Sequence, residues 1–228
     1  FQDNHYGENP FQTAIVKGKI EVVRMLLDLH KKSGETKNLV DTGVHVAVSK
    51  NNLEILNLLI KYNANLNQRD ENGHTPLTVA VCYGNRSIFK RLIECNETYN
   101  ALHQIHDENT PLHFAAKKGD IYMVNKLIQM GCPVDTENKT YMTPFHLAVT
   151  YGHTSIASRL LKEPLIQIHH KNNVGETPFL SAAYSSGDTD LLNLLINNGA
   201  NINDETSHGN TALHYASCKG FPKTVKLL

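Results

Sequence analysis

Apolar residues recur in a stripe of four positions along the chain, and the stripe predicts a series of amphipathic helices. Counted from a Gly or Asn, positions +4, +5, +8 and +9 are apolar in six successive segments. This spacing places the four side chains on one face of an α-helix. We expect each helix to bury its stripe against its neighbours. The stripes are Val22/Val23/Leu26/Leu27, Ile55/Leu56/Leu59/Ile60, Ile88/Phe89/Leu92/Ile93, Met123/Val124/Leu127/Ile128, Ile156/Ala157/Leu160/Leu161 and Leu191/Leu192/Leu195/Ile196.

A shorter helix is predicted before each stripe, because a start signal and a stop signal recur there. Thr or Asn can act as the N-cap, and the Pro that follows in most copies lacks a backbone N–H that the first turn does not need. Gly43 and Ala212 replace that Pro in two copies. Nine or ten residues after the cap, Gly or Asn favours the left-handed conformation that ends a helix. The predicted caps are Asn9, Thr42, Thr75, Thr110, Thr143, Thr177 and Thr211, and the predicted stops are Gly18, Asn51, Gly84, Gly119, Gly152, Gly187 and Gly220.

These signals repeat with a nearly constant period. Successive caps are 33, 33, 35, 33, 34 and 34 residues apart, so the chain contains seven copies of one unit. The most complete copy reads Thr-Pro-Leu-His-Phe-Ala at residues 110–115, and every copy has Ala five places after the cap. An invariant small residue at one place predicts a close helix contact, where a larger side chain would cost about 1–3 kcal/mol.

A unit of about 33 residues with a Thr-Pro-Leu-His-x-Ala core resembles the ankyrin repeat, which consists of a β-turn followed by two helices. The resemblance covers essentially the whole chain and implies an all-α ankyrin-repeat solenoid of seven β-turn/helix-loop-helix units, of which the first and last are imperfect. We expect a single array, and the ends of the sequence suggest an excerpt of a longer chain. The approximate units are 4–36, 37–69, 70–104, 105–137, 138–171, 172–205 and 206–228.

Extended connections between units, here called fingers, are predicted where Gly-Ala or a similar pair ends the second helix. Three fingers depart from the common pattern. The connection at 30–41 lacks the Gly-Ala pair, the one at 96–107 carries two extra residues, and the one that begins near Glu163 contains Pro164. Each departure reflects either sequence drift or a place where a partner is recognised.

Charge and composition exclude several classes of protein. Lys and Arg number 22, as do Asp and Glu, so no overall field favours nucleic acid or an anionic membrane. No apolar run approaches the roughly 18 residues needed to cross a bilayer. The cysteines, Cys82, Cys95, Cys132 and Cys218, form neither a dense disulfide pattern nor a Cys-x-x-Cys pair. We therefore expect reduced thiols and a cytoplasmic location, or the host cytosol if the protein is a secreted effector.

Thirteen histidines raise the question of metal binding or catalysis. Four of them occupy the fourth place of the repeat core, where the resemblance implies a structural histidine that hydrogen-bonds between adjacent turns. The finger histidines lack the Cys/His spacing of a zinc site, and neither Cys82 nor Cys218 has a base at suitable spacing for a nucleophile. We expect no metal, no cofactor and no enzymatic activity. The structural histidines are His45, His113, His146 and His214.

The resemblance implies that a partner binds a concave groove formed by finger tips and by the exposed ends of the first helices. Those ends are the places seven and eight residues after each cap, where Tyr and Lys are frequent. Tyrosine is a favoured interface anchor because its rigid ring buries a large area at a low entropic cost. We expect a monomeric scaffold that binds a protein along units three to six. The candidates are Tyr83, Lys117, Lys118, Tyr151 and Tyr184 on helix ends, with Glu71, His74, Tyr141 and Glu176 on the rim.

Two further hypotheses remain open from the sequence. In one, the array is a regulatory or targeting arm of a larger enzyme, channel or secreted host-directed effector, whose active segment lies outside this sequence. In the other, Asn67 and Asn203 are hydroxylated, because each follows a Leu by eight residues, similar to the substrate pattern of some ankyrin repeats. The simpler alternative is that these Asn residues only satisfy the finger turn.

Overall fold

The helices of this chain form antiparallel pairs, as the repeat predicted. The computed structural model describes residues 9–33, 36–95 and 109–228, and over these ranges it contains fourteen α-helices and no strand. The residues divide into two compact units. The first contains α1 (Pro10–Val16), α2 (Ile20–Ser33), α3 (Thr36–Ser49), α4 (Leu53–Lys61), α5 (Pro76–Tyr83) and α6 (Arg86–Ile93).

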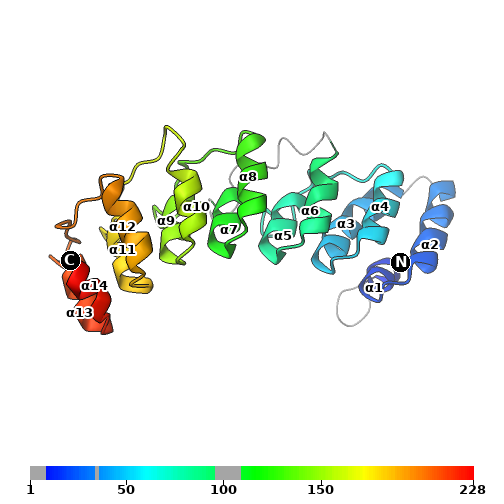
Figure 1. Cartoon of the computed structure of the whole chain (residues 1–228). Coiled ribbons are helices and arrows are strands. Elements are labelled where there is room, and N and C mark those ends of the chain that lie inside the picture. The colour runs from blue at the N-terminus through cyan, green and yellow to red at the C-terminus, as the bar shows by residue number, and fades with distance from the viewer. Residues whose placement is uncertain (1–8, 34–35, 96–108) are drawn as a thin grey trace. The chain divides into compact units, whose positions relative to one another are not determined.

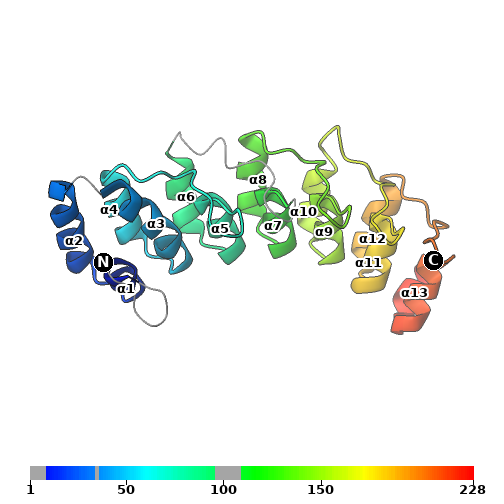
Figure 2. The same cartoon turned by 180° about the vertical axis from the view of Figure 1, so that it is seen from behind.

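The second compact unit contains the remaining four pairs. Its helices are α7 (Pro111–Lys118), α8 (Ile121–Gln129), α9 (Pro144–Thr150), α10 (Thr154–Leu160), α11 (Pro178–Ser185), α12 (Thr189–Asn197), α13 (Ala212–Lys219) and α14 (Pro222–Leu227). Within each compact unit, odd-numbered helices pack on odd-numbered helices and even-numbered on even-numbered, giving two layers (Figures 1 and 2). No helix in the described ranges has both the length and the apolar character needed to cross a membrane.

The core lies between the two layers and is built from the predicted positions. The repeated alanine is buried in all seven copies, which allows neighbouring first helices to approach closely. The first three positions of each predicted stripe are buried from α4 to α12, and the fourth is half-buried. The prediction is wrong at Val22, whose side chain is 45% exposed.

The predicted helix starts are correct at six of the seven caps. Asn9, Thr75, Thr143 and Thr177 accept a backbone N–H through their side chains, and Thr110 and Thr211 form capping boxes with a histidine. The predicted cap at Thr42 is wrong, because α3 already begins at Thr36 and the Thr42 hydroxyl donates to the carbonyl oxygen of Leu39.

The missing proline permits the early start of α3 but does not dictate it, because Thr211, which Ala212 follows, still caps α13. A proline disfavours helical backbone in the residue before it, so the five first helices with a proline after the cap begin at that cap. Gly43 imposes no such limit, and α3 extends toward the N-terminus. The expected irregular finger at 30–41 is therefore wrong: α2 continues to Ser33 and α3 starts three residues later. The finger expected at 96–107 lies outside the described residues.

Candidate protein-interaction surface

Each described finger between α4 and α5 and from α8 onward ends in a tight turn, which is held by the side chain of the first residue of that turn. In the finger before α11, Asn172 Oδ1 accepts from the backbone N–H of Val174 at 3.1 Å and of Glu176 at 2.9 Å. Asp70 Oδ1 and Asn138 Oδ1 accept the same pair of N–H groups in their fingers, and Thr206 Oγ1 does so before α13. These short polar side chains accept hydrogen bonds from backbone N–H groups of the turn that no regular helix or strand pairs.

The third residue after this capping side chain adopts a left-handed backbone in every such turn. Three fingers have glycine there: Gly73, Gly175 and Gly209, with φ of 77°, 80° and 75°. The fourth has Tyr141, with φ of 57° and a side chain that is 56% exposed. Bulky residues rarely adopt this conformation, and its cost is of order 1 kcal/mol. Tyr141 is therefore an exposed finger tyrosine with a strained backbone conformation.

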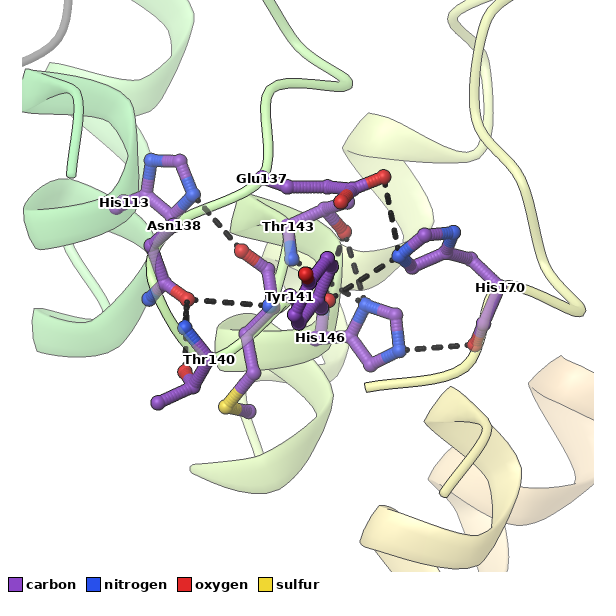
Figure 3. Close-up of polar contacts among 9 residues, drawn as sticks. His113, Glu137, Asn138, Thr140, Tyr141, Thr143, His146 and His170 are labelled. Atoms are coloured by element: carbon purple, nitrogen blue, oxygen red, sulfur yellow. Dashed lines mark hydrogen bonds and ion pairs between the residues drawn. The ribbon is translucent and has the colours of Figure 1, made fainter. Parts of the chain in front are cut away.

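The repeated histidines join each first helix to the next finger. His113 Nδ1 accepts from the Thr110 N–H at 3.0 Å, so Nε2 carries the proton and donates to the Met142 carbonyl at 3.1 Å. His146 makes the same contacts to Thr143 and to the His170 carbonyl, at 3.4 and 3.0 Å (Figure 3). His45 Nε2 lies 2.9 Å from the His74 carbonyl.

Burial keeps these rings neutral. It lowers the pKa of His113 from 6.5 to about 4. Burial, with a smaller contribution from nearby His170, lowers the pKa of His146 to about 4 as well. Burial also lowers the pKa of His45, partly opposed by its hydrogen bond to His74. His214 differs, because its side chain is exposed and its ring bonds within its own unit, to Thr211.

The ends of the first helices are held by the second helix of the following unit. His153, just before α10, places Nε2 3.0 Å from the carbonyl oxygen of Lys117 and packs over Gly119, where a Cβ would lie 2.6 Å from the ring. In the first compact unit, Asn85 donates to the carbonyl oxygen of Val48 at 2.8 Å. These bonds fix the helix ends at Val48 and Lys117 in position.

An open groove crosses the first compact unit between α3, α5 and the finger that connects α4 to α5. Its volume is about 440 Å³. Two of the predicted residues line it: Tyr83, which is 62% exposed, and His74, whose ring Nδ1 lies 3.5 Å from Asp70 Oδ2. Glu71 is exposed at the finger tip. The other lining residues are His45, Val46, Ser49, Asp70, Asn72, Val79 and Cys82.

In the second compact unit the helix ends form what we call the Lys–Tyr row, defined as Lys117, Lys118, Tyr151, Tyr184 and Lys219. All five side chains are exposed. The ammonium nitrogen of Lys117 lies 5.4 Å from the centroid of the Tyr151 ring, and that of Lys219 lies 3.9 Å from the centroid of the Tyr184 ring. Both distances are within the range of a cation–π contact.

The structure adds Tyr215, a residue that sequence analysis missed, to this surface. Its ring contacts Tyr184 edge-to-face at a centroid distance of 5.0 Å, and its hydroxyl donates to Glu176 Oε1 at 2.8 Å. Burial and the Glu176 carboxylate raise the pKa of Tyr215. Tyr215 lies four residues after its cap, one turn before the helix-end row, and no other copy has tyrosine at that place.

The remaining candidates differ in exposure. Asn203 is exposed and Asn67 is half-buried, and their backbone N–H groups donate to Asn201 Oδ1 and Asn65 Oδ1. Hydroxylation of these residues stays a prediction. Burial raises the pKa of Cys132 to about 11, whereas Cys218 is exposed. Within the described ranges, no group of three or more His, Cys, Asp or Glu side chains is arranged to hold a metal ion.

Comparison with known proteins agrees with this architecture. The family model described as ankyrin repeats (3 copies) matches residues 29–103, 88–172 and 163–228. Human transient receptor potential cation channel subfamily A member 1 is 32% identical over 124 residues, 54% of this chain and 11% of that protein. Mouse Rabankyrin-5 is 30% identical over 138 residues, 47% of this chain and 12% of that protein.

Alpha-latrotoxin-Lt1a from Latrodectus tredecimguttatus is 42% identical over 72 residues, 30% of this chain and 5% of the toxin. The chain thus spans at most about an eighth of the length of these relatives. The family model covers well over half of the chain, and the fourteen helices pair as its repeat requires. The predicted all-α repeat fold is confirmed, and the chain belongs to the ankyrin-repeat family.

Proposed function

We propose that this chain is a protein-interaction module, without chemistry of its own, that binds an extended segment or a small domain of a partner protein. The partner lies on the face lined by the fingers and the first-helix ends. The observation that carries this proposal is the exposure of large aromatic side chains at two adjacent repeat places, seven and eight residues after the cap: Tyr83 is 62% exposed, Tyr151 50% and Tyr184 44%. Exposed aromatic residues on a rigid scaffold are typical of interface anchors.

Rigid support strengthens this proposal. A tyrosine ring has few rotatable bonds, and the helix that carries each of these rings packs against neighbouring first helices. Less conformational entropy is then lost when a partner binds, so more of the contact energy appears as affinity. The open groove beside Tyr83 also provides a recess in which side chains of a partner can be buried.

The test is capture of partners from cytosolic extract on the immobilised chain, followed by titration of the purified partner. We expect Tyr83→Ala combined with Tyr151→Ala to weaken binding by on the order of 2 kcal/mol or more. Helical content measured by circular dichroism should not change, because both rings are exposed. Met25→Ala combined with Leu29→Ala is a matched control, since both are large exposed apolar residues, at 64% and 62%, but lie on the second helix α2 rather than on a finger or a first-helix end. Unchanged affinity of the double variant would reject this face.

A second candidate function is that of a regulatory or targeting arm within a larger enzyme, channel or secreted effector. The relatives favour it, because the matched segment makes up only 5–12% of each of them. In that case the bound segment belongs to the same polypeptide. The coding sequence on both sides of the printed chain tests this candidate, and the lack of any further domain there would reject it.

A further inference from the structure

We infer that the Lys–Tyr row binds an acidic, extended segment of the partner protein. The inference rests on the proposed function and names the chemistry of the partner at this surface. In such a complex, carboxylates of the segment meet Lys117, Lys118 and Lys219, while its apolar side chains and backbone lie against the faces of Tyr151 and Tyr184.

The charge distribution at the helix ends is the first support. The relevant places lie seven and eight residues after each cap. Across the seven copies they hold five lysines and no Asp or Glu. The whole chain, by contrast, has equal numbers of basic and acidic residues. The residues at these places are Val16/Lys17, Ser49/Lys50, Cys82/Tyr83, Lys117/Lys118, Thr150/Tyr151, Tyr184/Ser185 and Cys218/Lys219. A surface of one sign selects a partner of the opposite sign.

The placement of the lysines is the second support. Helix C-termini favour cations through the helix dipole, and this effect accounts for lysine at a helix end. It does not account for the ammonium group of Lys117 lying near the Tyr151 ring of the next repeat, or that of Lys219 lying over Tyr184 of the previous one. A ring covers only one side of an ammonium group, which has three donors. Among the described residues, no carboxylate forms an ion pair with either lysine.

One carboxylate, that of Glu176, lies close to the row and must be considered. It accepts hydrogen bonds from Tyr215 at 2.8 Å, from Ser181 at 3.1 Å and from Asn172 at 3.4 Å. Its charge is therefore largely satisfied by groups of the protein itself. These bonds also hold Tyr215 against Tyr184, which extends the aromatic surface of the row.

The same features favour a protein segment over a nucleic acid. A single strand of nucleic acid can stack on tyrosines, but it needs a continuous basic track for its phosphates. The row has three lysines and no arginine, and the fingers beside it carry carboxylates, with the Glu137 side chain 41% exposed and Glu205 exposed. A segment with a few carboxylates between apolar residues matches this pattern better than a polyanion does.

The experiment uses fluorescence anisotropy with the whole chain and labelled synthetic peptides of equal length, in which Glu alternates with apolar residues. In the matched peptides, Gln or Lys replaces every Glu, and a uridine oligonucleotide serves as the nucleic acid probe. We expect the Glu peptide to bind about tenfold more tightly than the Gln peptide, with an affinity that falls as salt is raised. The Lys peptide should bind least.

Variants then locate the site. Lys117→Gln with Lys219→Gln should weaken binding of the Glu peptide about fivefold, as loss of two partly exposed ion pairs does. The control, Lys162→Gln with Lys226→Gln, removes two exposed lysines outside the row and should leave binding unchanged. Tyr151→Ala should weaken binding of all peptides that bind, because the ring face is used whatever the charge.

The outcomes separate this inference from the proposed function. Equal binding of the Glu and Gln peptides, or tighter binding of the Lys peptide, overturns the acidic chemistry and leaves the proposed function standing. Preferred binding of the oligonucleotide through the row also overturns it. If no peptide binds and no row variant changes the affinity of captured partners, the acidic-segment inference and the proposed function are both rejected. Binding of the Glu peptide that the control pair weakens as much as the row pair overturns the assignment of the site.

Discussion

His170 donates from Nε2 to the carbonyl oxygen of Tyr141 at 3.1 Å, so one finger holds the strained turn of the finger before it (Figure 3). The same ring nitrogen lies 3.3 Å from Glu137 Oε1. Tyr141 occupies the place that Gly175 occupies in the next turn, with positive φ in both. A tyrosine kept there against its backbone preference points to a role for its exposed ring rather than for the turn.

The first prediction concerns the stability of this turn. Tyr141→Gly removes both the ring and the backbone strain, whereas Tyr141→Ala removes the ring and keeps the strain. We therefore expect the Gly variant to be more stable than the Ala variant by about 1 kcal/mol in urea unfolding. The reverse order would show that the left-handed backbone at Tyr141 carries no cost. Both variants should bind the partner less tightly than the native chain.

Local signals predicted most of the fold, and tertiary contacts explain where they failed. Caps, prolines and apolar spacing act within a few residues, so six of seven helix starts and nearly all stripe positions were correct. The cap predicted at Thr42 was wrong because Gly43, unlike the proline of five other copies, permits helical backbone before it, although Thr211 caps its helix without a following proline. The predicted burial of Val22 was wrong because apolar spacing shows which face of a helix is apolar, but not whether another helix covers that face.

The candidate surface was predicted less completely, for a related reason. The helix-end tyrosines could be located by counting seven or eight residues from each predicted cap. The contact of Tyr215 with Glu176 joins residues 39 positions apart, and no local pattern marks it. The cation–π contacts of Lys117 and Lys219 likewise depend on how adjacent repeats stack. His74 was predicted as a rim residue, yet its carbonyl and ring are engaged by His45 and Asp70.

A second prediction uses the glycine that replaces proline. A Cβ on Gly43 would lie 2.7 Å from Phe11 and 2.8 Å from Ile15, both fully buried. Gly43→Ala should improve helix propensity by about 1 kcal/mol, but overpacking of a closed core costs about 1–3 kcal/mol. We expect net destabilisation in urea unfolding. Phe11→Leu in the same chain should recover part of the loss, and a Gly43→Ala chain more stable than the native one would contradict the packing argument.

A third prediction concerns thiol reactivity. Cys218 is exposed, while Cys132 is buried with a pKa raised to about 11 by that burial. The thiolate is the reactive form, so a thiol reagent should modify Cys218 in the native chain and Cys132 only as the chain unfolds. Mass spectrometry of samples taken over time identifies the order at each cysteine, and Cys218→Ser should remove the early adduct on the peptide that contains residue 218. Modification of Cys132 at native-state rates would show that its surroundings open readily.

A fourth prediction follows from the neutral buried histidines. The pKa values of His113 and His146 are about 4 in the folded chain and 6.5 without burial, so the unfolded chain binds more protons between these values. Their contribution to stability is complete above about pH 6.5 and is lost as the pH falls toward 4. The loss is on the order of 3 kcal/mol for each ring. Urea midpoints measured across this range should fall steeply below pH 6.5.

Most carboxylates titrate near pH 4, so the interval from pH 6.5 to 5 is the one in which histidines dominate the slope. His113→Gln loses the bond to the Met142 carbonyl and should be less stable than the native chain at neutral pH, by about 1–3 kcal/mol. Its stability should nevertheless fall less steeply with acid, because one titrating ring is gone. Exposed His214, whose ring bonds within its own unit, provides the control for the lost bond: His214→Gln should cost less stability at neutral pH than His113→Gln. Equal slopes for the native chain and His113→Gln would mean that the buried ring accepts a proton without unfolding.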